Sequence, residues 1–205
     1  MTRIDPKVRR QSIINVALQL FKRDGFDAVR IDDILRETGL SKGGFYHYFK
    51  SREDILRHIV IEETSRLVSS LNSSVIVSDP LAALSELFLK GSSSLGAETG
   101  VLSTLDSFAA RIVYLDELER QLSLHLKPYI VKVIEQGVST GIFREVDSIA
   151  TAEMLMAVND HGNRCAVLDT LDKDQLQAYN RTGIEVLARH LGVEGALEKL
   201  LSGLQ

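Results

Sequence analysis

Apolar residues recur at helical spacing along almost the whole chain. Ile13, Ala17, Leu20 and Phe21 stand at positions i, i+4, i+7 and i+8, which form one face of an amphipathic helix. We find no segment with the apolar–polar alternation of a strand, and no internal repeat. The pattern predicts an all-α fold with about nine or ten helices.

Capping residues and glycines mark where the first helices begin and end. Asp24-Gly25 ends the first one, and Gly25 is free to adopt the left-handed C-cap conformation. A short helix over residues 31–38 ends at Gly39. Ser41 is the predicted N-cap of a helix that reaches about Tyr48. Ser51 caps a longer helix that reaches about residue 71.

The remaining two-thirds of the chain continues the helical pattern with interruptions. Residues 72–79 and the Ser/Gly-rich residues 91–100 are expected to be breaks, and Asp79-Pro80 restarts a helix between them. Pro128 removes a helical hydrogen bond and is expected to kink or split its helix. The later helices are predicted over residues 116–137, 147–168 and 173–190, with a short tail helix after Val193.

Charge is distributed unevenly along the chain. The net charge is −4, yet residues 1–60 contain twelve Lys and Arg against eight Asp and Glu, an excess of four positive charges. The remainder therefore carries a net charge of −8. A basic first part on an acidic body suits a protein whose N-terminal part meets phosphate. An excess of this size also arises by chance.

Composition excludes several classes of protein. No apolar run of about 18 residues predicts a membrane span, and no apolar block of the signal-peptide type follows Met1. The single cysteine, Cys165, is expected to be a small buried residue rather than a disulfide or metal ligand. The expected location is the cytoplasm.

The segment from Gly39 to Tyr48 has the arrangement of a helix-turn-helix. Gly39-Leu40-Ser41 forms the turn between two short helices. In the second helix Gly43-Gly44 lower helix propensity by about 1 kcal/mol each relative to alanine, but let the backbone approach a phosphate or a base edge closely. Lys42 and the run Tyr46-His47-Tyr48 add a cation and hydrogen-bonding aromatics. This composition favours a surface that contacts DNA.

Residues 9–56 resemble the DNA-binding domain of the TetR family of bacterial regulators. The resemblance rests on an ordered series of stretches: 13–21, 24–26, Ile34, 38–49 and 51–56. It implies an N-terminal three-helix helix-turn-helix domain over residues 1–52. A helical effector-binding and dimerisation domain over residues 53–205 would follow it.

The resemblance also assigns roles to single residues. Lys42, Gly43 and Gly44 match the start of the recognition helix, which faces the major groove. Tyr46 matches a tyrosine that binds phosphate, and His47 matches a position that often contacts DNA. Together with residues chosen for charge or capping, the predicted DNA-binding set is Arg30, Ser41, Lys42, Gly43, Gly44, Tyr46, His47, Lys50 and Arg52. Within it, Arg52 stands where the family has a phosphate-binding lysine, whereas Phe45 and Phe49 are expected in the core.

Five positions depart from the family pattern, among them Leu35 and Thr38, which replace the usual alanines of the two short helices. Arg30 stands where the family usually has Thr or Ser before the second helix, which loses a side-chain cap worth about 1 kcal/mol. Asp32 and Asp33 lie in the helix that crosses the phosphates and weaken any contact carried over to their positions. The alternative for the whole segment is a helical hairpin whose basic residues are only solvated.

The resemblance implies that the last two long helices, over residues 147–168 and 173–190, pair with their copies in a homodimer. Two reading helices related by a two-fold axis would bind a palindromic operator in double-stranded DNA, with half-sites about 34–36 Å apart. A small-molecule inducer would release the operator through a coupling between the two sites. Polar and apolar residues spread over the helices of the C-terminal domain are candidates for binding it: Phe108, Arg111, His125, Met154 and His161.

Other functions remain as alternatives. A DNA-binding activator, or a ligand-independent DNA-binding protein, shares the same N-terminal domain. We find no nucleophile elbow, no phosphate-binding glycine loop and no His-Glu-x-x-His motif, so we expect no enzyme activity and no metal or cofactor.

Overall fold

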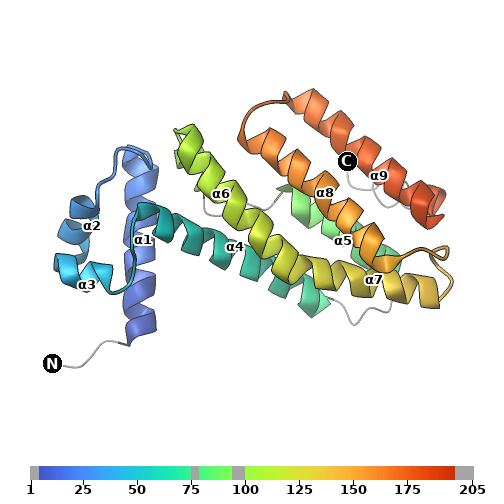
Figure 1. Ribbon diagram of the computed structural model, residues 1–205, viewed down its shortest axis with the longest axis horizontal. Helices are drawn as coiled ribbons and strands as arrows, with labels where there is room; N and C mark the ends of the chain where they lie inside the picture. Colours follow the sequence, from blue (N-terminus) through green and yellow to red (C-terminus); the bar gives the residue numbers. More distant parts are fainter. Residues whose placement is uncertain (1–4, 75–78, 94–99, 197–205) are drawn as a thin grey trace. The chain divides into compact units, whose positions relative to one another are not determined.

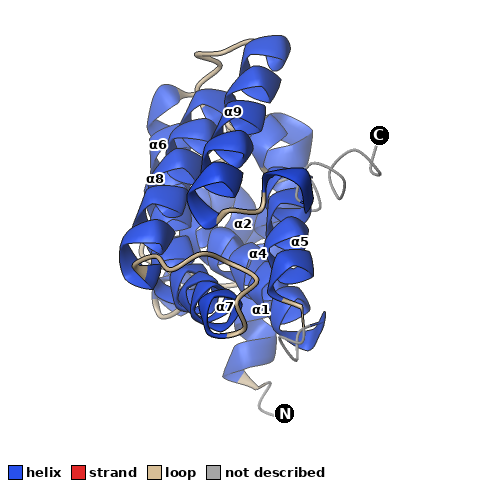
Figure 2. Ribbon diagram, turned by 90° about the vertical axis from the view of Figure 1, so that its right-hand side faces the viewer, coloured by secondary structure: helices blue, strands red, loops and turns tan. Residues whose placement is uncertain are grey.

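The computed structural model describes residues 5–74, 79–93 and 100–196. Within these ranges every regular element is a helix, as predicted, and Figure 2 shows helices joined only by loops. The chain forms two compact units, which we describe separately. The first lies within Met1–Glu63 and Gly96–Leu118, and the second within Thr64–Leu95 and Glu119–Gln205. The predicted domain boundary at residue 52 stays a prediction; by packing, the first unit also includes residues 53–63 and, among the described residues, 100–118.

Nine α-helices are present in the described residues (Figure 1). A 3-10 helix (Leu102–Thr104) precedes α6, and a π-helical turn (Leu122–Leu126) follows it. The α-helices are α1 (Pro6–Asp24), α2 (Ile31–Thr38), α3 (Lys42–Tyr46), α4 (Arg52–Ser74), α5 (Pro80–Ser93), α6 (Phe108–Gln121), α7 (Lys127–Ser139), α8 (Ser148–Val167) and α9 (Lys173–Leu191).

Helix α1 confirms the apolar periodicity. Its buried residues are Ile13, Ile14, Ala17, Leu20 and Phe21, which include all four positions predicted to share a face. Phe21 lies against Phe26, with ring centroids 4.9 Å apart, so the loop after α1 packs onto the core face of the helix.

Gly25 differs from the predicted left-handed cap. Its φ is +86°, which favours glycine, but its ψ of 149° lies outside the left-handed helical region. Its N–H donates to the Phe21 carbonyl at 2.9 Å and so still closes the last turn of α1. The extended ψ directs the chain away from the helix into the loop before α2.

The predicted break at Pro128 is present, but it takes a different form. The helix changes to π geometry over Leu122–Leu126, and Pro128 lies in the first turn of α7. Proline is tolerated there because the N–H groups of a first turn have no partner within the helix. The π turn exposes Leu124 and His125 to solvent.

In the second unit α7 packs against α5 and α8, and α8 packs against α9. The N-caps of α8 and α9 are as predicted. Asp147 accepts from the Ala150 N–H at 2.7 Å, and Asp172 accepts from the Gln175 N–H at 2.8 Å. Cys165 is buried, also as predicted.

Some predictions concern segment ends. Helix α4 continues to Ser74, three residues beyond its expected end, and residues 75–78 and 94–99 lie outside the described residues. Residues 197–205, which contain most of the predicted tail helix, also lie outside them. Among the helices that the structure describes, none has the length and apolar character needed to cross a bilayer.

Candidate nucleic-acid interface

The turn between α2 and α3 follows directly from local sequence. Gly39 adopts the left-handed conformation (φ 66°, ψ 18°) that ends α2. Ser41 Oγ accepts from the Gly44 N–H at 3.1 Å, so Ser41 is the N-cap of α3 as predicted. Helix α3 ends at Tyr46, two residues before its predicted end, and the chain continues as a turn through Tyr48.

Two buried phenylalanines hold this segment in place. Phe45 and Phe49 are almost completely buried, as predicted, with ring centroids 6.1 Å apart. The guanidinium of Arg10 lies over the Phe49 ring at 5.3 Å, and the Tyr46 ring meets Phe45 edge-on. Because the phenylalanines face the core, the residues between and around them face outward.

The outward residues are those that the sequence predicts to contact DNA. Ser41, Lys42, Gly43, Tyr46, His47 and Lys50 are exposed, and Gly44 is half-buried. A Cβ built on Gly43 would meet no atom within 4 Å, so the space above its backbone is open. The structure thus brings hydroxyl, ammonium, imidazole and bare backbone groups onto one short exposed segment, which we call the reading segment (residues 41–50).

Arg30, the residue before α2, is exposed. The Arg30 N–H donates to Asp33 Oδ2 at 2.9 Å, so the Asp33 carboxylate satisfies the backbone N–H of the residue that precedes α2. Arg36 Nη2 donates to the other oxygen of the same carboxylate at 2.6 Å. These two hydrogen bonds lower the pKa of Asp33 and offset its charge locally, whereas Asp32 is exposed.

The acidic residues in the first turn of α4 interact with residues next to them in the sequence. Ser51 Oγ accepts from the Asp54 N–H at 3.2 Å, and the Lys50 N–H donates to Asp54 Oδ2 at 2.9 Å. Burial acts to raise the pKa of Glu53, but a hydrogen bond from Ser51 and the nearby Arg52 hold it below its usual value. The carboxylates beside the reading segment are therefore partnered by the helix N-terminus.

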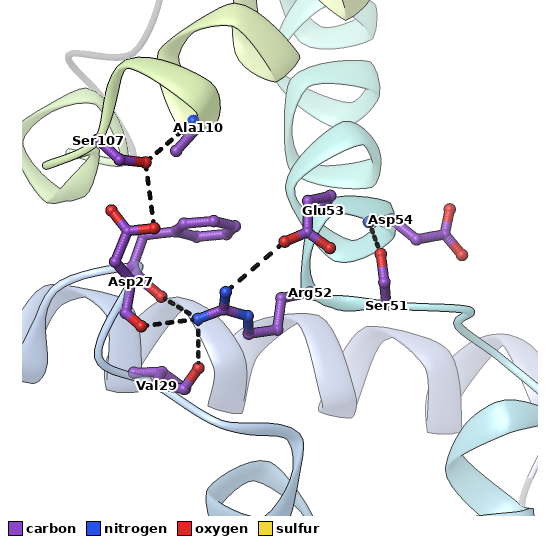
Figure 3. Close-up of polar contacts among 9 residues, drawn as sticks. Asp27, Val29, Ser51, Arg52, Glu53, Asp54, Ser107 and Ala110 are labelled. Carbon is purple, nitrogen blue, oxygen red and sulfur yellow. Dashed lines mark hydrogen bonds and ion pairs between the residues drawn. The ribbon is translucent and has the colours of Figure 1, made fainter.

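Arg52 does not point freely into solvent. Its Nη1 donates to the main-chain carbonyls of Phe26 (2.9 Å), Asp27 (2.9 Å) and Val29 (2.6 Å), as Figure 3 shows for the labelled loop residues. The predicted phosphate contact of Arg52 remains a prediction, and it has to be compatible with these three hydrogen bonds.

The predicted effector residues lie far apart in the sequence, and most are exposed. Phe108 is 68% exposed, and His125, Met154 and His161 are also exposed. His161 lies beside Cys165 and Tyr179. Only Arg111 is half-buried, and its Nε donates to the Leu105 carbonyl at 3.0 Å. Phe108 and Arg111 belong to the first compact unit, and His125, Met154 and His161 belong to the second, so their role in effector binding stays a prediction.

Other polar residues of the first unit are buried. Glu63, Tyr114 and Glu117 are almost completely inaccessible in the first unit. Burial, together with the Glu63 carboxylate, raises the pKa of Tyr114. The signal in the sequence was the stripe Ala110, Tyr114, Glu117, which places polar residues on the apolar face of α6. Within the described residues, no group of three His, Cys, Asp or Glu side chains could hold a metal ion.

Comparison with known proteins agrees with this geometry. Residues 13–59, from α1 to the start of α4, match the model of the family described as bacterial regulatory proteins, tetR family. The HTH-type transcriptional regulator YfiR of Bacillus subtilis is 25% identical over 158 residues, which cover 74% of this chain and 77% of YfiR.

Solved structures share the fold over most of the chain. A protein from Syntrophomonas wolfei assigned to the TetR family of transcriptional regulators superimposes with a TM-score of 0.62 at 24% identity, covering 90% of this chain and 97% of its own. FadR of Bacillus subtilis, solved with stearoyl-CoA, gives 0.56 at 19% identity, covering 88% and 98%. The ordered helix-turn-helix and the match of residues 13–59 to the family model make the N-terminal part of this chain similar to the bacterial regulatory proteins of the tetR family, and the solved structures share the fold over most of the chain.

Proposed function

We propose that this protein is a ligand-responsive transcriptional repressor that binds a palindromic operator as a homodimer and is released by a small-molecule inducer. The observation that supports the proposal most is the reading segment, an exposed set of DNA-binding chemistries mounted on two buried phenylalanines. A transcriptional regulator works on the chromosome, so its proposed location is the cytoplasm.

Each group of the interface has a proposed role. Lys42, Gly43 and Gly44 approach the major groove, and His47 contacts base edges or the adjoining backbone. The Tyr46 hydroxyl and the Lys50 ammonium bind phosphate, with Arg30 as a further cation before α2. Ser41 acts indirectly, because its side chain caps α3.

The dimer is proposed to form through α8 and α9. An exposed stripe on α8 combines Ala150, Met154, Ala157 and His161, spaced by three and four residues. Ile149 and, on α9, Val186 are also exposed. Small and apolar side chains on an exposed helical face favour close packing against a second copy.

A substitution in the stripe tests the dimer. Ala157→Glu would bury a charge at the interface, and we expect the dissociation constant of the dimer to rise at least about a hundredfold. Ala109→Glu changes an exposed alanine on α6 in the same way and is the control. Sedimentation velocity over a dilution series measures both, and an Ala157→Glu dimer as tight as the wild type would refute this interface.

The proposal that a small molecule binds this protein rests on the shared fold. The related FadR fold was solved with stearoyl-CoA, so helices arranged in this way accommodate a small molecule in at least one protein. Phe108, Arg111, His125, Met154 and His161 stay candidates for inducer contacts, and the half-buried Arg111 is the one with a guanidinium partly shielded from water. An inducer has to bind the DNA-incompetent state more tightly than the competent one, by several kcal/mol.

The decisive experiment is footprinting on the DNA that flanks the gene, combined with in vitro transcription. We expect protection of a palindrome, loss of protection with rising salt, and lower transcription from the occupied promoter. Raised transcription would favour the alternative, an activator. If genome-wide selection yields no specific site, the proposed function is wrong.

A further inference from the structure

The loop between α1 and α2 (residues 25–30), which we call the α1–α2 loop, is held from two sides. On one side the α4 residue Arg52 places Nη1 within 2.6–2.9 Å of three loop carbonyls, those of Phe26, Asp27 and Val29. Its guanidinium also lies over the Phe26 ring, 5.1 Å from the centroid. Hydrogen bonds from a charged donor are stronger than neutral ones, so one side chain fixes most of the loop backbone.

On the other side the loop meets the start of α6. Ser107 Oγ accepts from the Ala110 N–H at 3.2 Å, and so caps α6, and it donates to Asp27 Oδ1 at 3.1 Å (Figure 3). One residue earlier in the loop, the Phe26 N–H donates to the Thr104 carbonyl at 2.9 Å. The loop is thus hydrogen-bonded to residues 104–107 through both main chain and side chain.

Close packing at Gly25 makes this arrangement specific. A Cβ at Gly25 would lie 2.4 Å from Asp106 Oδ2, and the φ of +86° independently favours glycine. The loop ends at Arg30, which is the N-cap residue of α2. A displacement of the loop therefore moves the beginning of α2, and α2 leads through Gly39 into the reading segment.

The geometry of Arg52 argues against a simple phosphate ligand. Only 24% of its side chain is exposed, and Nη2 lies 3.7 Å from Glu53 Oε1. Lys50, two residues earlier, has an exposed side chain and uses only its backbone N–H in the hydrogen bond to Asp54. The two cations therefore have different surroundings, although they are neighbours in the sequence.

We propose that the α1–α2 loop is the joint through which the start of α6 sets the placement of the reading segment, with Arg52 and Asp27 as positioning residues rather than DNA ligands. The effect on DNA binding rests on the proposed function. The effect on the loop itself does not, because the loop contacts exist in the protein without DNA.

Asp27 provides a pair of variants with matched charge. Asp27→Asn keeps an oxygen that accepts from Ser107, whereas Asp27→Ala removes it, and both lose the same negative charge. We expect Asp27→Ala to speed amide hydrogen exchange at residues 26–30 of the free protein and to weaken operator binding about three- to tenfold relative to Asp27→Asn. Identical exchange and identical binding in the two variants would overturn the proposal.

Arg52 and Lys50 provide a second matched pair. We expect Arg52→Gln to speed exchange in the loop of the free protein and to weaken binding without changing the slope of log K against log salt. Lys50→Gln should leave exchange unchanged and reduce that slope by about 0.9, as for one phosphate contact. A reduced slope with unchanged exchange in Arg52→Gln would show that Arg52 is a phosphate ligand, contrary to the proposal.

The readouts separate failure of this proposal from failure of the proposed function. If the wild type binds no specific DNA, the function is wrong, but exchange in the free protein still decides whether Arg52 and Asp27 fix the loop. If Arg52→Gln does not fold, the Asp27 pair, which alters an exposed side chain, decides the same question.

Discussion

The reading segment and the buried polar residues of α4 and α6 differ in where their polar side chains lie. In the reading segment, Lys42, Tyr46 and His47 are exposed and the aromatic anchor beneath them is buried. Around Tyr114 the polar groups are themselves buried, as the almost inaccessible Glu63 shows. Exposed polar side chains need only a short segment that is anchored to the core. Buried polar side chains need segments that are distant in the sequence to pack together.

The largest effect is expected from removing the support of the reading segment. Phe45→Ala leaves a cavity beneath α3 and should lower the free energy of unfolding by about 3–5 kcal/mol. Phe108→Ala makes the same change at a phenylalanine that is 68% exposed, and should alter it by less than about 0.5 kcal/mol. Urea denaturation compares them, and equal losses would contradict the assignment of Phe45 to the core.

A glycine in the second unit should give the next largest effect. Gly137 is buried in α7, and a Cβ added to it would overlap Cδ2 of the buried Phe143 ring. Gly137→Ala should therefore destabilise the protein by about 2–3 kcal/mol, despite the better helix propensity of alanine. Adding Phe143→Leu should restore part of the loss in thermal unfolding. A Gly137→Ala protein as stable as the wild type would mean that Phe143 moves aside freely.

The same substitution in the reading segment should act in the opposite direction on stability. At Gly43 an added Cβ meets nothing, so Gly43→Ala should stabilise the free protein by about 0.5–1 kcal/mol. If the backbone of Gly43 approaches DNA closely, operator binding should weaken by about 1–2 kcal/mol, close to the cost of one mismatched base pair. Thermal unfolding and mobility-shift titration test the two halves. Unchanged DNA affinity would place Gly43 away from the groove.

The smallest effect concerns a carboxylate of the second unit. Burial first, and the charge of Glu119 second, raise the pKa of Asp160 to about 6, although Arg164 opposes them. The folded pKa lies above the ordinary value, so the folded chain holds this proton more tightly. The contribution to stability is therefore greatest below about pH 4 and is lost as the pH rises through 6.

Asp160→Asn tests this pH dependence. The neutral amide removes the cost of the buried charge, so at pH 8 the variant should be more stable by about 1 kcal/mol, a value reduced for the solvent screening of a half-buried group. At pH 4 the two proteins should unfold together. A gain that is the same at both pH values would show that Asp160 does not titrate in this range.

The sequence predicted most of the fold because its signals are local. Ser41, Asp147 and Asp172 cap helices through bonds to residues three positions later, a distance that the sequence displays directly. A break in the helix near Pro128 was expected, but the π-helical turn that precedes it was not. The π turn before it depends on how the helix packs, and sequence periodicity does not report packing.

Prediction was least complete where side chains meet across long separations in the chain. Arg52 was expected to contact phosphate on the strength of its position, yet its nearest acceptors are carbonyls 23 to 26 residues earlier. The exposed Phe108 and His125 were chosen as effector candidates by residue type. The buried Glu63, in contrast, was not chosen, because a glutamate in an amphipathic helix looks solvated in sequence.

The sequence by itself therefore determined the all-helical architecture and the reading segment, since both depend on residues within a few positions of one another. Only the tertiary structure decided what the α1–α2 loop contacts, which of the cations near α4 is exposed, and which polar groups are buried. These depend on which distant segments pack together. The identity of each residue limits which segments can pack together. The balance of burial and hydrogen bonding over the whole folded chain decides which of them do.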